Sequence, residues 1–152
     1  MIEIKAPNPI DFTMPTLFLA GSIEMGTAEK WQERVVRELR DWEGAILNPC
    51  RDDWDSSWVQ SINNPQFREQ VEWELEALEN SDWIFMYFDP QTKSPITLLE
   101  LGLSITLDGL IVVCPDGFWR KGNVEIVCSR FKIPLFKSIE EGLGELKTAI
   151  TS

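Results

Sequence analysis

The stretch Ser94-Pro-Ile-Thr-Leu-Leu-Glu-Leu-Gly-Leu-Ser-Ile-Thr-Leu107 follows an apolar run over residues 83–88 and a polar segment over residues 89–93. This order predicts a strand, a loop and a helix, because a short apolar run is typical of a buried strand and Pro95 suits the first turn of a helix. Residues 95–107 are apolar or small on every face except at one position, which is typical of a buried helix.

The exception in this helix is Glu100. At about 100° per residue it shares a face with Ile96, Leu103 and Leu107. A lone carboxylate there is costly to bury unless it is paired or protonated. It also follows the end of a predicted central strand, where open α/β sheets place their ligands. Glu100 is therefore the leading candidate for a catalytic residue; the alternative is a surface glutamate that only looks buried in a helical projection.

The same alternation of short apolar runs and amphipathic segments extends along the chain. Strands are predicted at 16–20, 45–48, 83–88, 110–114 and 133–136, with a short edge strand at 2–5 in an extended arm over 1–15. Helices are predicted at 28–42, 65–80, 95–107, 123–131 and 139–150. Strands that alternate with helices predict a parallel sheet sandwiched by helices. A length of 152 residues is typical of one domain.

The helix at 65–80 places a second glutamate on its inner side. Its predicted apolar stripe consists of Phe67, Val71, Leu75 and Leu78. Glu74 falls inside this stripe, whereas the other glutamates of the helix point outward. The chain would thus hold two inward-facing carboxyls, Glu74 and Glu100, on the helices either side of the strand at 83–88. Two carboxyls with separated roles are typical of retaining glycoside chemistry, with apolar walls raising one pKa and hydrogen bonds keeping the other low.

Composition limits the chemistry further. The net charge of -11 and the pI near 4.4 disfavour nucleic acid and anionic membrane as partners. The chain has no histidine, which excludes Ser-His-Asp triads, Cys-His pairs and His-containing metal sites. Cys50, Cys114 and Cys128 show no C-x-x-C spacing, so we expect reduced thiols and a cytoplasmic protein. The N-terminus lacks a signal-peptide pattern and no run is long enough to cross a bilayer, so we expect a soluble protein.

Two loops offer binding groups. The turn that begins Gly21-Ser22-Ile23 follows the strand at 16–20, and a glycine there lets backbone N–H groups approach a ligand. An ordinary turn between a strand and a helix is the alternative. The long loop over residues 49–64 carries Asp53 and Trp54, which offer an acceptor and a stacking face for a flat heterocycle. The alternative is a surface loop pinned by its two tryptophans.

Four segments carry a resemblance to a known family: Phe18-Leu-Ala-Gly-Ser-Ile23, Asn48-Pro-Cys-Arg-Asp-Asp-Trp54, Gln70-Val-Glu-Trp-Glu74 and Pro95-Ile-Thr-Leu-Leu-Glu-Leu-Gly102. They resemble the nucleoside 2-deoxyribosyltransferase family, to which the deoxynucleoside 5'-monophosphate N-glycosidases are related. The resemblance covers roughly residues 16–136. It implies a flavodoxin-like or Rossmann-like three-layer α/β fold with about five parallel strands. It also implies cleavage of the N-glycosidic bond of 2'-deoxynucleosides without a cofactor.

The resemblance also implies roles for individual residues. Glu100 would attack C1' to form a covalent deoxyribosyl-enzyme, from which a free nucleobase collects the sugar. Glu74 would contact the departing base and help to move its proton. Asn123 resembles an asparagine that enters the neighbouring subunit's site and holds the 5'-hydroxyl, which requires at least a dimer.

The chain departs from the family pattern at three positions. Phe18 stands where many members have tyrosine, Glu74 where the family has aspartate, and Ser94 where an acidic residue is common. Ser22 and Ser94 would suit a phosphate, as in the monophosphate hydrolases. Two rival functions therefore stay open: a hydrolase of deoxynucleoside 5'-monophosphates, and a nucleotide-sensing module without turnover.

Overall fold

The sheet that was expected from the strand pattern is present and has one more strand than the resemblance implied. The computed structural model describes residues 1–23 and 30–152, and its six strands are all parallel in the order β1-β3-β2-β4-β5-β6. The strands are β1 (Ile2–Lys5), β2 (Thr16–Gly21), β3 (Ala45–Asn48), β4 (Trp83–Tyr87), β5 (Leu110–Val113) and β6 (Leu135–Phe136). The additional strand is β1, which pairs with β3 in the register Ile2↔Ala45.

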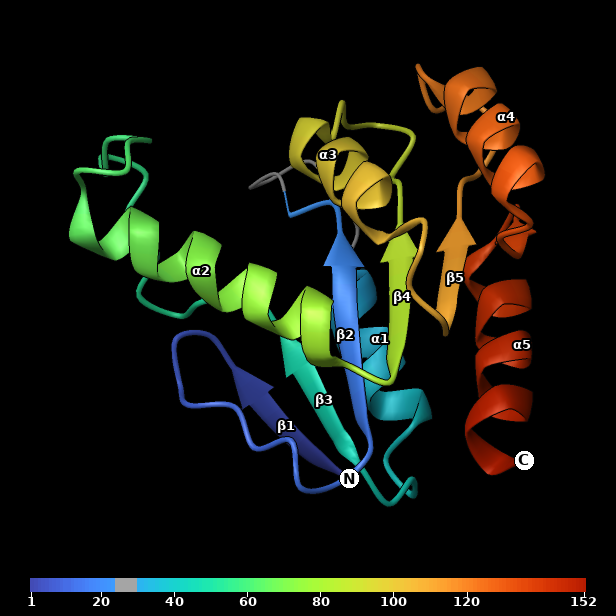
Figure 1. Ribbon diagram of the computed structural model, residues 1–152, viewed down its shortest axis with the longest axis horizontal. Helices are drawn as coiled ribbons and strands as arrows, with labels where there is room; N and C mark the ends of the chain where they lie inside the picture. Colours follow the sequence, from blue (N-terminus) through green and yellow to red (C-terminus); the bar gives the residue numbers. More distant parts are fainter. Residues whose placement is uncertain (24–29) are drawn as a thin grey trace.

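Five helices cover the two faces of the sheet among the described residues. They are α1 (Trp31–Glu38), α2 (Pro65–Asn80), α3 (Pro95–Ser104), α4 (Lys121–Phe131) and α5 (Ile139–Thr151). Figure 1 shows α2 and α3 in front of the sheet and α1 behind it. The result is the expected three-layer α/β sandwich.

Alternation along the strands creates two cores. In β2, Phe18 and Ala20 face the core that contains residues of α2, α3 and α4, whereas Leu17 and Leu19 face the core formed with α1 and α5. Every residue of β2 is buried, as expected for a central strand that is covered on both faces.

Two helices are shorter than predicted. The helix expected at 28–42 ends at Glu38, after which the Trp42 N–H bonds the Leu39 carbonyl in a turn; residues 24–29 lie outside the described part. The helix expected at 95–107 ends at Ser104, whose hydroxyl bonds the Glu100 carbonyl at 2.8 Å. A serine hydroxyl that bonds a carbonyl one turn earlier competes with the backbone ladder and is unfavourable within a helix.

The parallel strands bring their carboxyl ends to one edge of the sheet, the upper edge in Figure 1. The segments that follow β2, β3, β4 and β5 therefore meet there. Gly21 at the end of β2 allows this close approach, because a Cβ at this position would lie 2.5 Å from the Tyr87 carbonyl oxygen and 2.7 Å from the Trp31 ring. None of the helices in the described ranges is long and apolar enough to cross a membrane.

Candidate active site

Glu100 is buried, with 6% of its surface exposed, so the alternative of a surface glutamate is wrong. Two of its three predicted neighbours on the helix face are wrong, however, whereas the third, Leu107, is partly buried and packs against the core. The buried side of α3 consists of Thr97, Glu100, Leu101 and Ser104. Ile96 and Leu103 are 59% and 51% exposed. Glu100 therefore lies at the border between the inner and outer faces of the helix. Around the helix axis it is about 40° and 60° from the buried residues Ser104 and Thr97 on one side, and about 40° and 60° from the exposed residues Ile96 and Leu103 on the other.

The inner side of α2 also differs from the predicted stripe. Its buried residues are Gln70, Trp73, Ala77 and Leu78. Val71 is 36% exposed and faces outward. Glu74 follows Trp73 and is partly buried, so its inward placement is confirmed. Of its other expected neighbours, Leu78 is buried and Phe67 and Leu75 are partly buried. Trp73 packs edge to face against Phe18 of β2, with ring centroids 6.4 Å apart.

Both glutamates have raised pKa values. Burial raises the pKa of Glu74 to about 7, while a hydrogen-bonding interaction with the Gln70 side chain opposes this rise. Burial raises the pKa of Glu100 to about 8, and the charge of Glu74 raises it further. The expectation that one carboxyl would keep a low pKa is therefore wrong, because both side chains leave water. Between pH 7 and pH 8 the two residues hold one proton between them, and the lower pKa of Glu74 places this proton on Glu100.

A cluster of three hydroxyl groups joins the ends of β2 and β4. Thr92 Oγ1 lies 3.1 Å from Ser22 Oγ and 2.7 Å from Ser94 Oγ, and the two serine hydroxyls also hydrogen-bond each other. The Asp89 N–H donates to Ser22 Oγ at 2.9 Å. All three hydroxyl residues are buried. The predicted residues Ser22 and Ser94 thus come together immediately before α3, the helix that carries Glu100.

Thr92 is a member of this cluster that sequence reasoning missed. In the sequence Thr92 is only a hydroxyl residue two positions before Ser94. No local pattern indicates its contact with Ser22, because the two residues are 70 positions apart. Gly21 precedes Ser22 at the same place. Ile23 is 42% exposed and borders the undescribed segment, which contains the rest of the predicted glycine turn.

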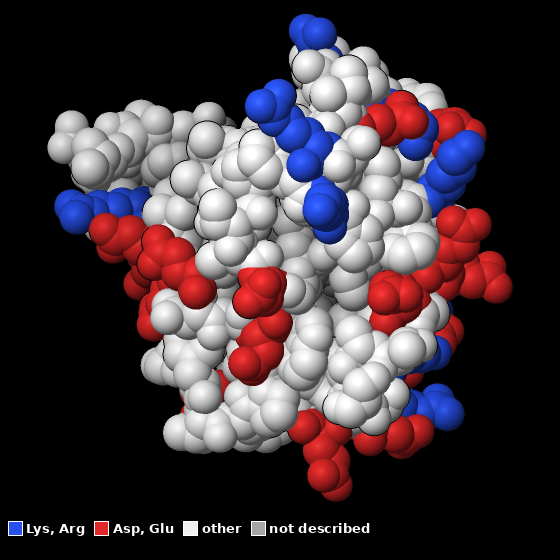
Figure 2. Space-filling view, turned by 45° about the vertical axis from the view of Figure 1, so that its right-hand side comes forward, with Lys and Arg blue, Asp and Glu red and all other residues white. Residues whose placement is uncertain are grey.

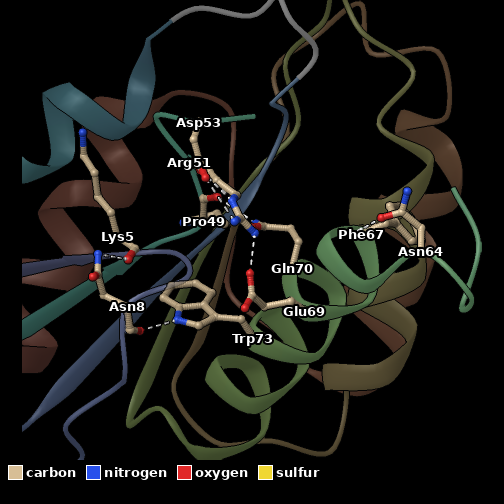
Figure 3. Close-up of polar contacts among 10 residues, drawn as sticks. All are labelled: Lys5, Asn8, Pro49, Arg51, Asp53, Asn64, Phe67, Glu69, Gln70 and Trp73. Carbon is tan, nitrogen blue, oxygen red and sulfur yellow. Dashed lines mark hydrogen bonds and ion pairs between the residues drawn. The ribbon is translucent and has the colours of Figure 1, made fainter. Parts of the chain in front are cut away.

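The loop after β3 is held by Arg51, another residue that was missed (Figure 3). Arg51 Nε lies 2.8 Å from Asp53 Oδ1, and Arg51 Nη1 lies 3.0 Å from Glu69 Oε1 on α2. The guanidinium also stacks on the Trp58 ring at 5.0 Å. Trp54 packs against Trp58 with ring centroids 5.0 Å apart. Asp53 and Trp54 are therefore engaged in the packing of the loop itself, as in the alternative of a pinned surface loop.

Asn123 lies exposed in the first turn of α4. Its contribution to a neighbouring subunit stays a prediction, since a single chain is described. In residues 1–23 and 30–152, no group of three or more Cys, Asp and Glu side chains is arranged to hold a metal ion.

The family described as nucleoside 2-deoxyribosyltransferase like has a model that matches residues 14–118. No curated protein matches the chain. The matched segment contains Ser22, Glu74, Ser94 and Glu100 but ends before Asn123. Because it spans more than half of the 152 residues, the chain belongs to the nucleoside 2-deoxyribosyltransferase-like family.

Proposed function

We propose that this protein transfers 2-deoxyribose between nucleobases by cleaving the N-glycosidic bond of 2'-deoxynucleosides. The observation that carries the proposal is the pair of carboxyls with raised pKa values, Glu74 on α2 and Glu100 on α3, of which the charge of the first raises the pKa of the second. The substrates are 2'-deoxynucleosides and free nucleobases, and the reaction uses no cofactor. Such exchange would serve nucleoside salvage, and the three free cysteines suit a cytoplasmic location.

The proposed reaction has two steps, formation and breakdown of a covalent intermediate. Glu100, as the carboxylate, forms an ester bond to C1' while the bond from C1' to the base nitrogen breaks and Glu74 gives its proton to the departing base. In the second step a free base attacks C1', the ester breaks, and Glu74 takes the proton of the incoming base. The carboxylate also stabilises the positive charge that develops at C1'.

Between pH 7 and pH 8 the two pKa values place the single proton of the free protein on Glu100, so this division of labour requires the proton to move to Glu74 when the substrate reacts. The productive form has its proton on Glu74 and its negative charge on Glu100, and positive charge developing at C1' favours that form. The singly protonated pair is most abundant between the two pKa values, about 7 and about 8. A doubly protonated pair lacks the nucleophile, and a doubly ionised pair lacks the acid.

The pH dependence of kcat/KM is therefore expected to be bell-shaped, with its maximum between pH 7 and pH 8. Initial rates of base exchange measured from pH 5.5 to pH 9.5 would show it. Glu74→Gln removes the proton donor, so this variant should be slower and should lose the decline at high pH. A rate that stays constant across this range in the wild type would contradict the shared-proton mechanism.

A second candidate function is hydrolysis of deoxynucleoside 5'-monophosphates, and it is favoured by cations at the same edge of the sheet. Lys93 Nζ and Arg120 Cζ lie 5.4 Å and 4.6 Å from the centroid of the Trp119 ring. Trp119 Nε1 donates to the Lys93 carbonyl at 2.8 Å, which joins the loops after β4 and β5. Figure 2 shows Lys and Arg side chains over the upper part of the face in view, where the strands end. With the hydroxyls of Ser22 and Ser94, these cations could bind a phosphate.

Product analysis distinguishes the functions. We expect a 2'-deoxynucleoside incubated with a different free base to yield the new nucleoside. Formation of deoxyribose 5-phosphate alone, from a monophosphate and without transfer to added base, would instead support the hydrolase. Binding without any turnover would support the nucleotide-sensing module.

We further propose that the protein is at least a dimer in which Asn123 completes the neighbour's site. Support comes from the outer side of α3, where Ile96, Leu99 and Leu103 are 59%, 60% and 51% exposed. An apolar surface of this kind on a helix that carries a catalytic residue is suited to contact with a second copy.

Leu99→Glu is expected to convert the dimer into monomers, because charged side chains would have to be buried against an apolar surface. Sedimentation equilibrium would show the loss of mass, and base exchange should fall with it. Ile62→Glu is the matched control: Ile62 is 69% exposed in the loop before α2, and its replacement should leave the dimer intact. A wild type that sediments as a monomer while fully active would contradict the shared site.

A further inference from the structure

The segment between β4 and α3, at the upper edge of the sheet in Figure 1, contains Thr92, which is not among the site residues predicted from the sequence. Thr92 is buried, with 4% of the residue exposed. Its Oγ1 lies 2.9 Å from the Asp89 carbonyl oxygen, 2.7 Å from Ser94 Oγ and 3.1 Å from Ser22 Oγ. Thr92 thus contacts both serines of the hydroxyl cluster and a carbonyl of its own loop.

The protons of the hydroxyl cluster can be placed without conflict. A carbonyl oxygen only accepts, so the Thr92 hydroxyl donates to Asp89. The Thr92 oxygen then accepts from the Ser94 hydroxyl, and Ser94 in turn accepts from the Ser22 hydroxyl. The Ser22 oxygen accepts from the Asp89 N–H at 2.9 Å. In this order, loss of the Thr92 hydroxyl removes the acceptor of the Ser94 proton.

Ser94 is the N-cap residue of α3 and has a left-handed backbone conformation, with φ 44° and ψ 55°. This conformation is uncommon for a residue other than glycine and persists only where the surroundings hold it. A serine at an N-cap usually bonds an N–H of the first helical turn. The Ser94 side chain makes no such bond and hydrogen-bonds Ser22 and Thr92 instead. Contacts with the hydroxyl cluster therefore replace the local cap at the start of α3.

The conformation of Ser94 determines where α3 begins and in which direction it runs. The Ser94 carbonyl accepts the first hydrogen bond of the helix, from the Leu98 N–H at 3.1 Å. Glu100 follows about 9 Å along the helix axis, and its own carbonyl accepts from Ser104 Oγ at 2.8 Å. Because this distance is less than two helical turns, a change of direction at Ser94 would displace the Glu100 carboxyl.

The residue between Thr92 and Ser94 is bonded from the other side of the segment. Trp119 Nε1, in the loop after β5, donates to the Lys93 carbonyl at 2.8 Å. Residues 92–94 are thus joined to the end of β2 through hydroxyl groups and to the loop after β5 through the indole. Loss of the hydroxyl contacts would leave this segment bonded unequally on its two sides.

We propose that Thr92 is a positioning residue for the reaction: its hydroxyl, acting through Ser94, holds the start of α3 so that the Glu100 carboxylate reaches C1'. This inference rests on the proposed function, in which Glu100 is the nucleophile. Attack requires the reacting atoms to be about 3–3.5 Å apart and aligned. A small displacement of α3 would therefore slow the first chemical step more than it would weaken substrate binding.

Thr92→Val tests the role, because valine keeps the branched shape of threonine and lacks the hydroxyl. We expect kcat for base exchange to fall about 10-fold or more, while KM changes by less than about 2-fold. Thr92→Ser keeps the hydroxyl and should retain most of the wild-type kcat. Thr16→Val is the matched control: Thr16 is also buried and its Oγ1 donates to Asp82 Oδ2 at 3.3 Å, but it lies at the opposite end of β2 from Ser22. It should lower stability and leave kcat unchanged.

A double-mutant cycle tests whether Thr92 acts through Ser94. In a Ser94→Ala background, the further change Thr92→Val should reduce kcat by less than about 2-fold, because the two hydroxyls act as a unit. A further loss as large as the loss in the wild-type background would show that the two residues act independently, and would overturn the proposal. Loss of kcat in Thr92→Ser equal to that in Thr92→Val would also overturn it.

Amide hydrogen exchange of Leu98 measures the start of α3 independently of activity, and in the wild type it needs no variant. After correction for intrinsic rates, the Leu98 N–H should exchange on the order of 10-fold more slowly than that of Val124, which makes the first hydrogen bond of α4 where no side chain caps the helix. Thr92→Val should remove most of this difference.

The two possible failures can be told apart. A Leu98 N–H that exchanges as fast as that of Val124 in the wild type, or unchanged exchange of Leu98 in Thr92→Val, would overturn the positioning role of Thr92 alone. Absence of base exchange in the wild type would instead refute the proposed function, and the exchange of Leu98 would still show whether Thr92 holds the start of α3.

Discussion

Glu100→Gln is expected to reduce base exchange by on the order of 10³-fold or more, because an amide cannot act as the carboxylate nucleophile on C1'. The substitution keeps the size of the side chain, so substrate binding should be affected much less than turnover. Chromatographic separation of the donor and product nucleosides would measure the rate.

The matched control is Glu79→Gln, which changes an exposed glutamate of α2 in the same way. This variant should exchange bases at the wild-type rate. A Glu100→Gln variant that is folded and retains normal exchange would show that another group attacks the sugar, and the assignment of Glu100 would then be wrong.

Glu100→Gln is also expected to stabilise the folded protein, by about 2–4 kcal/mol at pH 8. In the folded protein Glu100 keeps its proton up to a pKa of about 8, whereas the ordinary value is 4.5. The unfolded chain therefore releases this proton first as the pH rises, and the wild type loses stability between these two values. Glutamine does not ionise, so the gain from the substitution should be close to zero near pH 4.5, increase up to pH 8 and then stay constant.

Urea unfolding at pH 5, 6.5 and 8 would measure this gain as a difference in the free energy of unfolding. Glu79→Gln serves as the control here too, since an exposed carboxyl should give little pH-dependent difference. A gain from Glu100→Gln that is the same at all three pH values would contradict burial of an ionisable Glu100.

The order of strands and helices was predictable because each element has its own local pattern of apolar and polar residues. The apolar runs predicted five strands, and the short segment at residues 2–5 predicted the sixth. The faces of α2 and α3 were predicted less well. Val71, Ile96 and Leu103 are apolar but turn outward, so hydrophobic periodicity alone could not distinguish the side that packs on the sheet from the exposed side.

The candidate site was predictable only in part, for a related reason. A lone glutamate in an apolar helix is visible in the sequence, and Glu100 was found in this way. Thr92, Arg51 and Gln70 carry no such local signal. Their partners are far away along the chain: 70 residues separate Thr92 from Ser22, 18 separate Arg51 from Glu69, and 21 separate Gln70 from Pro49. Such contacts depend on the topology of the sheet.

The covalent intermediate on Glu100 can be trapped and detected. The protein would be mixed with 2'-deoxyinosine or 2'-deoxycytidine without an added acceptor base, quenched in acid, and analysed by mass spectrometry as intact protein and as peptides. We predict an adduct of one deoxyribosyl unit on the peptide that contains Glu100, and its disappearance when a free base is added before the quench. Consumption of the nucleoside without any adduct, or with the adduct on another residue, would show that Glu100 does not attack the anomeric carbon.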